Sequence, residues 1–351
     1  MHGDNMNKLG VVAIIVVIAI IIAAAAYYYY STQQSKTQKT VTIHLYTSMP
    51  TNIATQLIQM FEKKYPNIHV ELYRSGTSKV LAKLQAEIES GHVVCDIIWV
   101  ADPSGIVQLK DKGYLLKFTP NDADRILYKD PDGYWYAGRI IVPVIAWNTQ
   151  ILKSNHPTSW LDLASPQYKA TLPSPWNKAS TWAAIPNPLY SGAATVVAYV
   201  LSEKYGWKYF EEIKNNGVTV VKSNSAVLNG IINKEYPVGV TLDYMVRQHK
   251  ANGDPVDYVF PKDAVILIPS PIAILKTTPH PDAAKTFVNF ILSKEVQEWL
   301  SQQGFIPARS DVKLPAGVPA LNTLNVVQIN WDQVAKNLEN VRTQFQNIMM
   351  K

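Results

Sequence analysis

The chain has 351 residues, of which 47% are hydrophobic and 17% charged, so it is long enough for two domains with packed cores. Its formal net charge of +6 comes from Lys and Arg residues that are scattered rather than clustered, which excludes an extended nucleic-acid-binding surface. The single cysteine, Cys95, excludes a disulfide within the chain.

The N-terminal segment, residues 1–30, predicts where the protein acts. Residues 9–26 are uninterruptedly apolar or glycine and four tyrosines follow, a pattern typical of a membrane helix with an aromatic belt. We expect this segment to remain as an anchor or to be cleaved as a signal peptide near the small residues 23–26. Residues 31–40 contain no apolar side chain and predict a tether. The globular part is therefore expected to begin near Val41 and to lie outside the cell.

Strand–loop–helix units open the globular part. Residues 41–46 and 68–73 are predicted strands, and helices are predicted after each of them. The second helix carries Val80, Leu84 and Ile88 at helical spacing, with Thr77 or Ser78 as its expected cap and Gly91 just past its end. A short apolar run at 93–100 then predicts a third, buried strand. Such an order indicates a parallel sheet with helical crossovers.

Two apolar segments that contain prolines, 139–147 and 265–275, are interpreted as crossings between two lobes. We therefore expect a first lobe at 41–142 plus 266–310, a second lobe at 143–265, and a helical tail at 311–351 that packs on both. Within the second lobe, helices are predicted from about 192, 207 and 226, and strands at 218–221 and 237–242.

Small or hydroxylated turns precede several predicted helices, and such helix starts favour anions because their backbone N–H groups are free. Arg139, at the first crossing, could bind a phosphate or carboxylate through two hydrogen bonds. The alternatives are that the turns only cap helices, that Arg139 is a surface arginine and that Asp243 is a helix cap. The candidate ligand-binding residues are Thr47, Ser48, Ser75, Gly76, Thr77, Ser78, Ala101, Asp102, Arg139, Ser191, Gly192, Ala193, Ser225, Asp243 and Tyr244.

No catalytic pattern stands out. The seven histidines are dispersed without metal-binding spacing, and Ser191 lacks the glycine frame of a nucleophile elbow. We therefore expect no catalytic residue, no metal and no cofactor. An enzyme on the same scaffold is the alternative of another class, and a tethered scaffold without a solute is a third.

The order and spacing of several short segments resemble the extracellular solute-binding proteins of ABC importers, in the branch for iron, phosphonates and sugar phosphates. The resemblance covers about residues 41–340. The segments that carry it are Leu45–Ser48, Ser75–Lys79, Cys95–Trp99, Lys112–Leu115, Ser191–Ala193, Asp243–Tyr244, Lys285–Ser293, Gly304–Arg309, Val326–Val327 and Asn330–Trp331.

This resemblance implies an α/β, two-lobed periplasmic-binding-protein fold of type II, with a mixed sheet flanked by helices in each lobe. It also implies an anionic, phosphate- or phosphonate-bearing solute, an ABC permease as partner and a monomeric protein. Iron-binding members use a histidine after the first strand and two adjacent tyrosines. Here no such histidine follows the first strand, and Asp243–Tyr244 stands in place of the tyrosine pair. Ferric iron is therefore the alternative solute within the same class.

Overall fold

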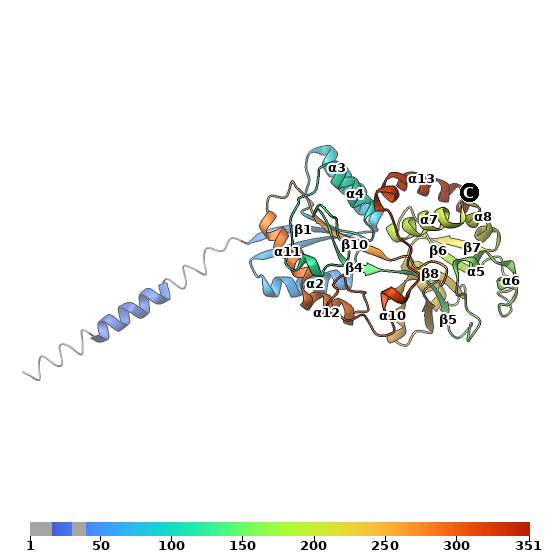
Figure 1. Ribbon diagram of the computed structural model, residues 1–351. Helices are drawn as coiled ribbons and strands as arrows, with labels where there is room; N and C mark the ends of the chain where they lie inside the picture. The colour runs from blue at the N-terminus through green and yellow to red at the C-terminus, as the bar shows by residue number, and fades with distance from the viewer. Residues whose placement is uncertain (1–15, 30–39) are drawn as a thin grey trace, which may run out of the picture.

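The computed structural model describes residues 16–29 and 40–351 (Figure 1). Residues 16–29 form a helix with exposed apolar side chains, among them Ile20 and Ile22. Over the described ranges, no helix combines the length and the apolar character that crossing a membrane requires. Residues 9–15 of the predicted membrane segment and residues 31–39 of the predicted tether lie outside the described part of the chain.

The first sheet has five strands in the order β2–β1–β3–β10–β4. The strands β1 (Val41–Thr47), β2 (Ile68–Arg74) and β3 (Ile97–Trp99) are parallel, as the sequence predicts. Each is followed by a helix: α2 (Thr51–Lys64), α3 (Thr77–Ser90) and α4 (Ser104–Asp111). Two antiparallel strands, β10 (Ile268–Ile274) and β4 (Tyr136–Ile141), complete the sheet and make it mixed.

The strand predicted at 93–100 is shorter than expected. The backbone N–H groups of Val94 and Cys95 donate to the carboxylate of Glu87 on α3, at 3.0 and 3.3 Å, and β3 begins only at Ile97. A buried carboxylate that satisfies these N–H groups takes the place of a strand partner.

The second sheet has the order β7–β6–β8–β5–β9. Its strands are β5 (Pro143–Asn148), β6 (Ala183–Pro186), β7 (Val218–Val221), β8 (Val238–Leu242) and β9 (Val256–Val259). The helices around it are α5 (Trp160–Ala164), α6 (Pro166–Ala170), α7 (Gly192–Tyr205), α8 (Lys208–Asn215), α9 (Asn224–Ile232) and α10 (Asp243–Ala251). The sequence did not reveal β6 and β9, because each is only four residues long and lies beside loop-rich stretches.

The chain passes between the two sheets twice. β4 ends at Ile141 and β5 begins at Pro143, while the return runs from β9 to β10. Figure 1 shows the two sheets side by side, each with its own helices. These are the positions at which the sequence predicts the crossings. The lobe boundaries at 142, 265 and 310 remain predictions.

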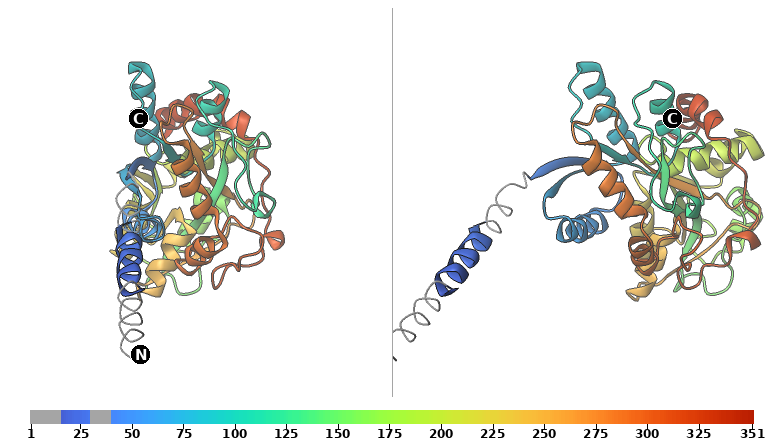
Figure 2. Two further views of the ribbon diagram at one scale, coloured as in Figure 1. Left: turned by 90° about the vertical axis from the view of Figure 1, so that its left-hand side faces the viewer. Right: turned by 60° about the vertical axis from the view of Figure 1, so that its left-hand side comes forward.

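Three further helices hold this arrangement together: α11 (Pro281–Leu292), α12 (Lys294–Gln302) and α13 (Trp331–Met349). α11 packs beside β1 and β10, and its orange ribbon stands next to the blue first strand in the right-hand view of Figure 2. Phe61 of α2 lies edge-on to Phe287 and Phe290 of α11, at 4.9 and 5.3 Å between ring centroids. α13 packs against α4 beside the first sheet and against α7 and α8 beside the second.

Candidate functional site

A cavity of about 340 Å³ lies between the two sheets. Its walls come from the first turns of α2, α3, α7, α9 and α10, together with Arg74 at the end of β2 and Arg139 on β4. Helix starts expose backbone N–H groups that have no partner inside the helix, and the helix dipole adds positive potential there. Five such starts around one cavity create an environment that favours negative charge.

The caps of these helices differ between the two sides of the cavity. Ser191 Oγ accepts a hydrogen bond from Ala194 N at 3.2 Å at the start of α7, and Ser223 Oγ does the same for Ala226 N in α9. On the other side, α3 begins after Gly76, which supplies no side-chain cap. The expectation that Thr77 or Ser78 caps α3 is therefore wrong, because both lie inside the helix.

Arg139 is buried at the cavity wall, with only 2% of its surface exposed. Its Nε and Nη1 atoms have no hydrogen-bond partner. The guanidinium carbon lies 5.2 Å from the ring centroid of Tyr244 and 4.7 Å from that of Phe305. Aromatic faces stabilise a cation but do not satisfy its N–H donors. Burial lowers the pKa of Arg139, although the nearby Tyr244 opposes this effect. The side chain is thus a buried cation, and two of its three nitrogen atoms lack a partner within the described chain.

Tyr244 lies in the first turn of α10, and its ring packs against Phe305 with 4.3 Å between centroids. Burial raises the pKa of its hydroxyl group, while the charge of Arg139 acts in the opposite direction. The phenol therefore stays neutral at ordinary pH and can donate a hydrogen bond.

The two sides of the cavity touch at two glycines. A Cβ atom at Gly76 would lie 2.7 Å from the Tyr190 ring, and one at Gly192 would lie 1.8 Å from Asp102 Oδ2. Only a residue without a side chain fits at such an approach. Because Gly76 and Asp102 lie beside the first sheet and Tyr190 and Gly192 beside the second, the two sides of the cavity approach each other closely here.

Nine of the fifteen residues predicted from the sequence line this cavity, and six do not. The lining residues are Ser48, Gly76, Thr77, Ala101, Arg139, Ser191, Ala193, Ser225 and Tyr244. The residues that lie outside its lining are Thr47, Ser75, Ser78, Asp102, Gly192 and Asp243.

The predicted residues outside the lining mostly support the framework. Thr47 Oγ1 donates to Trp99 O at 2.6 Å, and Ser78 Oγ accepts a hydrogen bond from Arg342 of α13. Asp102 is buried against Ser104, which donates to it, and burial raises the pKa of its carboxyl group.

Asp243 is fully buried rather than free for a ligand. One carboxylate oxygen forms an ion pair with Arg247 and the other accepts a hydrogen bond from Val142 N at 2.9 Å. Asp243 is also the first residue of α10 rather than its cap. Its carboxylate therefore fixes the crossing between the sheets to the start of α10.

The sequence reasoning missed Arg74 and one face of α10. Arg74 directly precedes the predicted Ser75–Ser78 turn, so its position at the end of a strand was the available signal. Beyond the predicted Tyr244, the residues Met245, Gln248, His249 and Asn252 also line the cavity, at helical spacing over two turns. Asn52 in α2 and Tyr190 before α7 also line the cavity and were not in the predicted set, since single residues of this kind carry no distinctive pattern. Ser223 and Asn224 line it as well, in the same predicted helix start as Ser225.

The described lining of the cavity carries positive side chains and no acidic ones. Among the described residues that line it, two are arginines and none is aspartate or glutamate. No group of three or more His, Cys, Asp or Glu side chains in residues 16–29 and 40–351 is arranged to hold a metal ion. The lining therefore offers donors and positive charge, which match an anion, and no carboxylate that would match a cation.

Comparison with known families finds one match that spans most of the globular part. The profile of the bacterial extracellular solute-binding proteins matches residues 47–298. A putative 2-aminoethylphosphonate-binding periplasmic protein of Salmonella typhimurium is 27% identical over 208 residues. This alignment covers 55% of the chain and 58% of the Salmonella protein, so it spans little more than half of either.

Solved structures share the fold. The periplasmic binding protein AfuA from Actinobacillus pleuropneumoniae, with exogenous fructose-6-phosphate bound, superposes with a TM-score of 0.77 at 21% identity. The alignment covers 88% of this chain and 98% of AfuA. Iron-bound HitA from Pseudomonas aeruginosa gives a TM-score of 0.75 at 18% identity, with coverage of 88% and 99%. At such identities the similarity establishes the two-lobed periplasmic-binding-protein fold.

Proposed function

The chain belongs to the bacterial extracellular solute-binding proteins, and we propose that it captures a small anionic, phosphate- or phosphonate-bearing solute for an ABC importer. The observation that carries this proposal is Arg139, a buried cation with two partnerless nitrogen atoms at the wall of a cavity that has no lining carboxylate. A buried charge without a partner is costly, and an anion that accepts from it removes that cost.

The solute is held between two lobes, which we propose to be residues 41–142 with 266–310 and residues 143–265. Closure about the two crossings brings the starts of α3, α7, α9 and α10 against the anion and excludes water. Water exclusion strengthens each charge-assisted hydrogen bond. The closed protein then presents the solute to a permease in the membrane.

We further propose that residues 9–30 attach the protein to the cell membrane. Support comes from the apolar run at 9–26 in the sequence and from the exposure of Ile20 and Ile22 in the helix at 16–29. Alkaline carbonate extraction of cell membranes checks this: the full chain should stay in the membrane pellet, and release into the supernatant contradicts the attachment.

The proposed solute class is tested by isothermal calorimetry on the full chain in mild detergent. We expect binding of phosphate esters or phosphonates and none of neutral sugars. Substitution Arg139→Met removes the charge at similar volume and should weaken anion binding at least a hundredfold, about 3 kcal/mol. Arg125→Met is the matched control, because Arg125 is exposed and its side chain pairs with the neighbouring Asp124. Equal binding by wild-type protein and Arg139→Met contradicts the proposal.

Ferric iron is the second candidate, because two tyrosines, Tyr190 and Tyr244, line the cavity. Phenolate oxygen is a suitable ligand for a hard cation. Titration with ferric citrate separates the two candidates, since iron–phenolate binding produces a visible absorption band. A band that appears with iron and is lost in Tyr244→Phe would favour ferric iron over the anion.

A receptor leaves its solute chemically unchanged, whereas an enzyme converts it. Recovery of unchanged solute after prolonged incubation with the protein would therefore support a receptor.

A further inference from the structure

The cavity is longer than an inorganic anion. Its lining follows one face of α10 from Tyr244 to Asn252, eight residues, or about 12 Å along the helix. Arg139 stacks on Tyr244 at the beginning of this path. A solute that fills the path therefore has a substantial part that extends away from its anionic group.

Burial changes steadily along this path. Arg139 and Tyr244 are almost completely buried, at 2% and 4% exposure. Gln248 and His249 are partly exposed, and Asn252 is exposed. Beyond Asn252 the cavity adjoins a wider groove of about 990 Å³, which shares Asn52, Gln248 and Asn252 with it. The buried end of the path, at Arg139, is thus the end that suits the anionic group of the solute, and the opposite end opens to solvent.

The outer end is lined by amide and imidazole groups from both sides of the cleft. Asn52 comes from α2, Gln248 and His249 come from α10, and Asn252 directly follows α10. The Gln248 amide nitrogen donates to Gln303 O at 2.7 Å, which leaves the amide oxygen as an acceptor. His249 Nδ1 contacts Asp254 Oδ2 at 2.6 Å. Amide and imidazole groups pair well with hydroxyl groups.

A positively charged group on the solute finds no unpaired carboxylate along the described part of this path. The lining contains no carboxylate, and Asp257 of the adjoining groove is already paired with Lys250 at 2.8 Å. An ammonium only two carbons from the phosphorus would lie close to Arg139, Arg74 and the positive helix starts. Like charges at such separations repel, so an aminoalkyl phosphonate is disfavoured.

From these observations we propose that the solute is a hydroxylated organic anion whose anionic group enters first and whose uncharged, hydroxyl-bearing remainder extends along α10 toward Asn52 and Asn252. This inference rests on the proposed function, because it specifies the solute of the same cavity. It also predicts that the site rejects a zwitterion that shares the same anionic group.

Calorimetry of the full chain with four probes tests the inference. Fructose-6-phosphate supplies the anion, the length and the hydroxyl groups. n-Butyl phosphate lacks the hydroxyl groups, inorganic phosphate lacks the remainder, and 2-aminoethylphosphonate adds the ammonium. We expect fructose-6-phosphate to bind at least tenfold more tightly than each of the others. Equal or tighter binding of any other probe overturns the inference and leaves the proposed function standing. Failure of all four to bind overturns both.

A double variant separates the outer end from the anion end. Asn52→Ala/Asn252→Ala changes two exposed side chains, one on each side of the cleft. We expect about tenfold weaker binding of fructose-6-phosphate and unchanged binding of inorganic phosphate. Asn347→Ala, at an exposed position on α13, is the control and should change neither. Equal weakening of both ligands by the double variant overturns the assignment of these residues to the hydroxyl-bearing part.

Discussion

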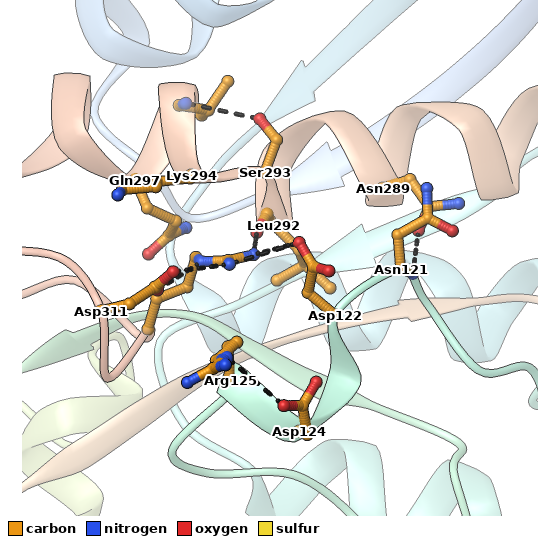
Figure 3. Close-up of polar contacts among 12 residues, drawn as sticks. Asn121, Asp122, Asp124, Arg125, Asn289, Leu292, Ser293, Lys294, Gln297 and Asp311 are labelled. Atoms are coloured by element: carbon orange, nitrogen blue, oxygen red, sulfur yellow. Dashed lines mark hydrogen bonds and ion pairs between the residues drawn. The ribbon is translucent and has the colours of Figure 1, made fainter.

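Two buried arginines in this molecule have opposite surroundings. Arg139 and Arg309 are exposed to 2% and 3% of their surface. Arg309 donates from Nε and Nη2 to the two oxygens of Asp311, at 2.8 and 3.0 Å, and from Nη1 to Asp122 and Leu292 O. Asp122, Asp311 and Leu292, which accept these hydrogen bonds, lie close to one another in Figure 3. Arg139 instead has two nitrogen atoms without a partner.

The electrostatic consequences also differ in sign. The hydrogen bonds that Arg309 donates to Asp311 raise the pKa of Arg309, whereas burial lowers the pKa of Arg139. Removal of a buried charge that the chain itself pairs leaves its partners unsatisfied and destabilises the fold, whereas a buried charge without a partner is stabilised by a ligand that pairs with it. Equal burial therefore does not mean equal function, and the hydrogen-bond partners decide which arginine belongs to the binding site.

Removal of the satisfied arginine should have the largest effect on stability. We expect Arg309→Met to lower the free energy of unfolding by about 3 kcal/mol, because the Leu292 carbonyl loses a donor and two carboxylates lose their cation. Urea denaturation monitored by tryptophan fluorescence measures this. Binding of the anionic solute at low temperature should survive. A change below about 0.5 kcal/mol would show that the hydrogen bonds of Arg309 contribute little.

Removal of the unsatisfied arginine should have the opposite effect. We expect ligand-free Arg139→Met to gain about 1 kcal/mol in the free energy of unfolding, because an apolar side chain between Tyr244 and Phe305 avoids an uncompensated buried charge. The same denaturation experiment without solute measures this gain. A loss as large as that of Arg309→Met would mean that Arg139 is structural, and the comparison between the two arginines would fail.

The smallest expected effect is a loss of stability at low pH. Hydrogen bonds from Arg309 lower the pKa of Asp311 from its usual value near 3.8 to about 2. Because the folded-state pKa is depressed, this stabilisation is present above about pH 4 and is lost as the pH falls toward 2. It amounts to about 1 kcal/mol or less, since Asp311 is 30% exposed. Urea denaturation of wild-type protein and of Arg309→Met at pH 5 and at pH 2.5 measures this contribution. The difference in free energy of unfolding between the two proteins should be smaller at pH 2.5 than at pH 5. A difference in free energy of unfolding that is the same at both pH values would contradict the contribution of the Arg309–Asp311 pair.

The sequence by itself determined much of this protein. Strand-like and helical periodicities located β1, β2, α2 and α3, because each element buries one face of a regular pattern. The apolar segments with prolines marked both crossings, and the turns before α7 and α9 showed where helix starts could meet an anion. These features depend on local geometry, which short stretches of sequence encode.

Only the tertiary structure decided which polar residues form the site. Asp243 and Tyr244 are neighbours in sequence, yet one pairs with Arg247 and the other lines the cavity. Arg139 and Arg309 look alike in sequence, and only the packing of Phe305 and Tyr244 deprives one of them of partners. Hydrogen-bond partners far apart in the chain come together only when it folds, so local pattern cannot assign them. For that reason the sequence predicted an anion site, and the folded chain shows which arginine is the candidate for it.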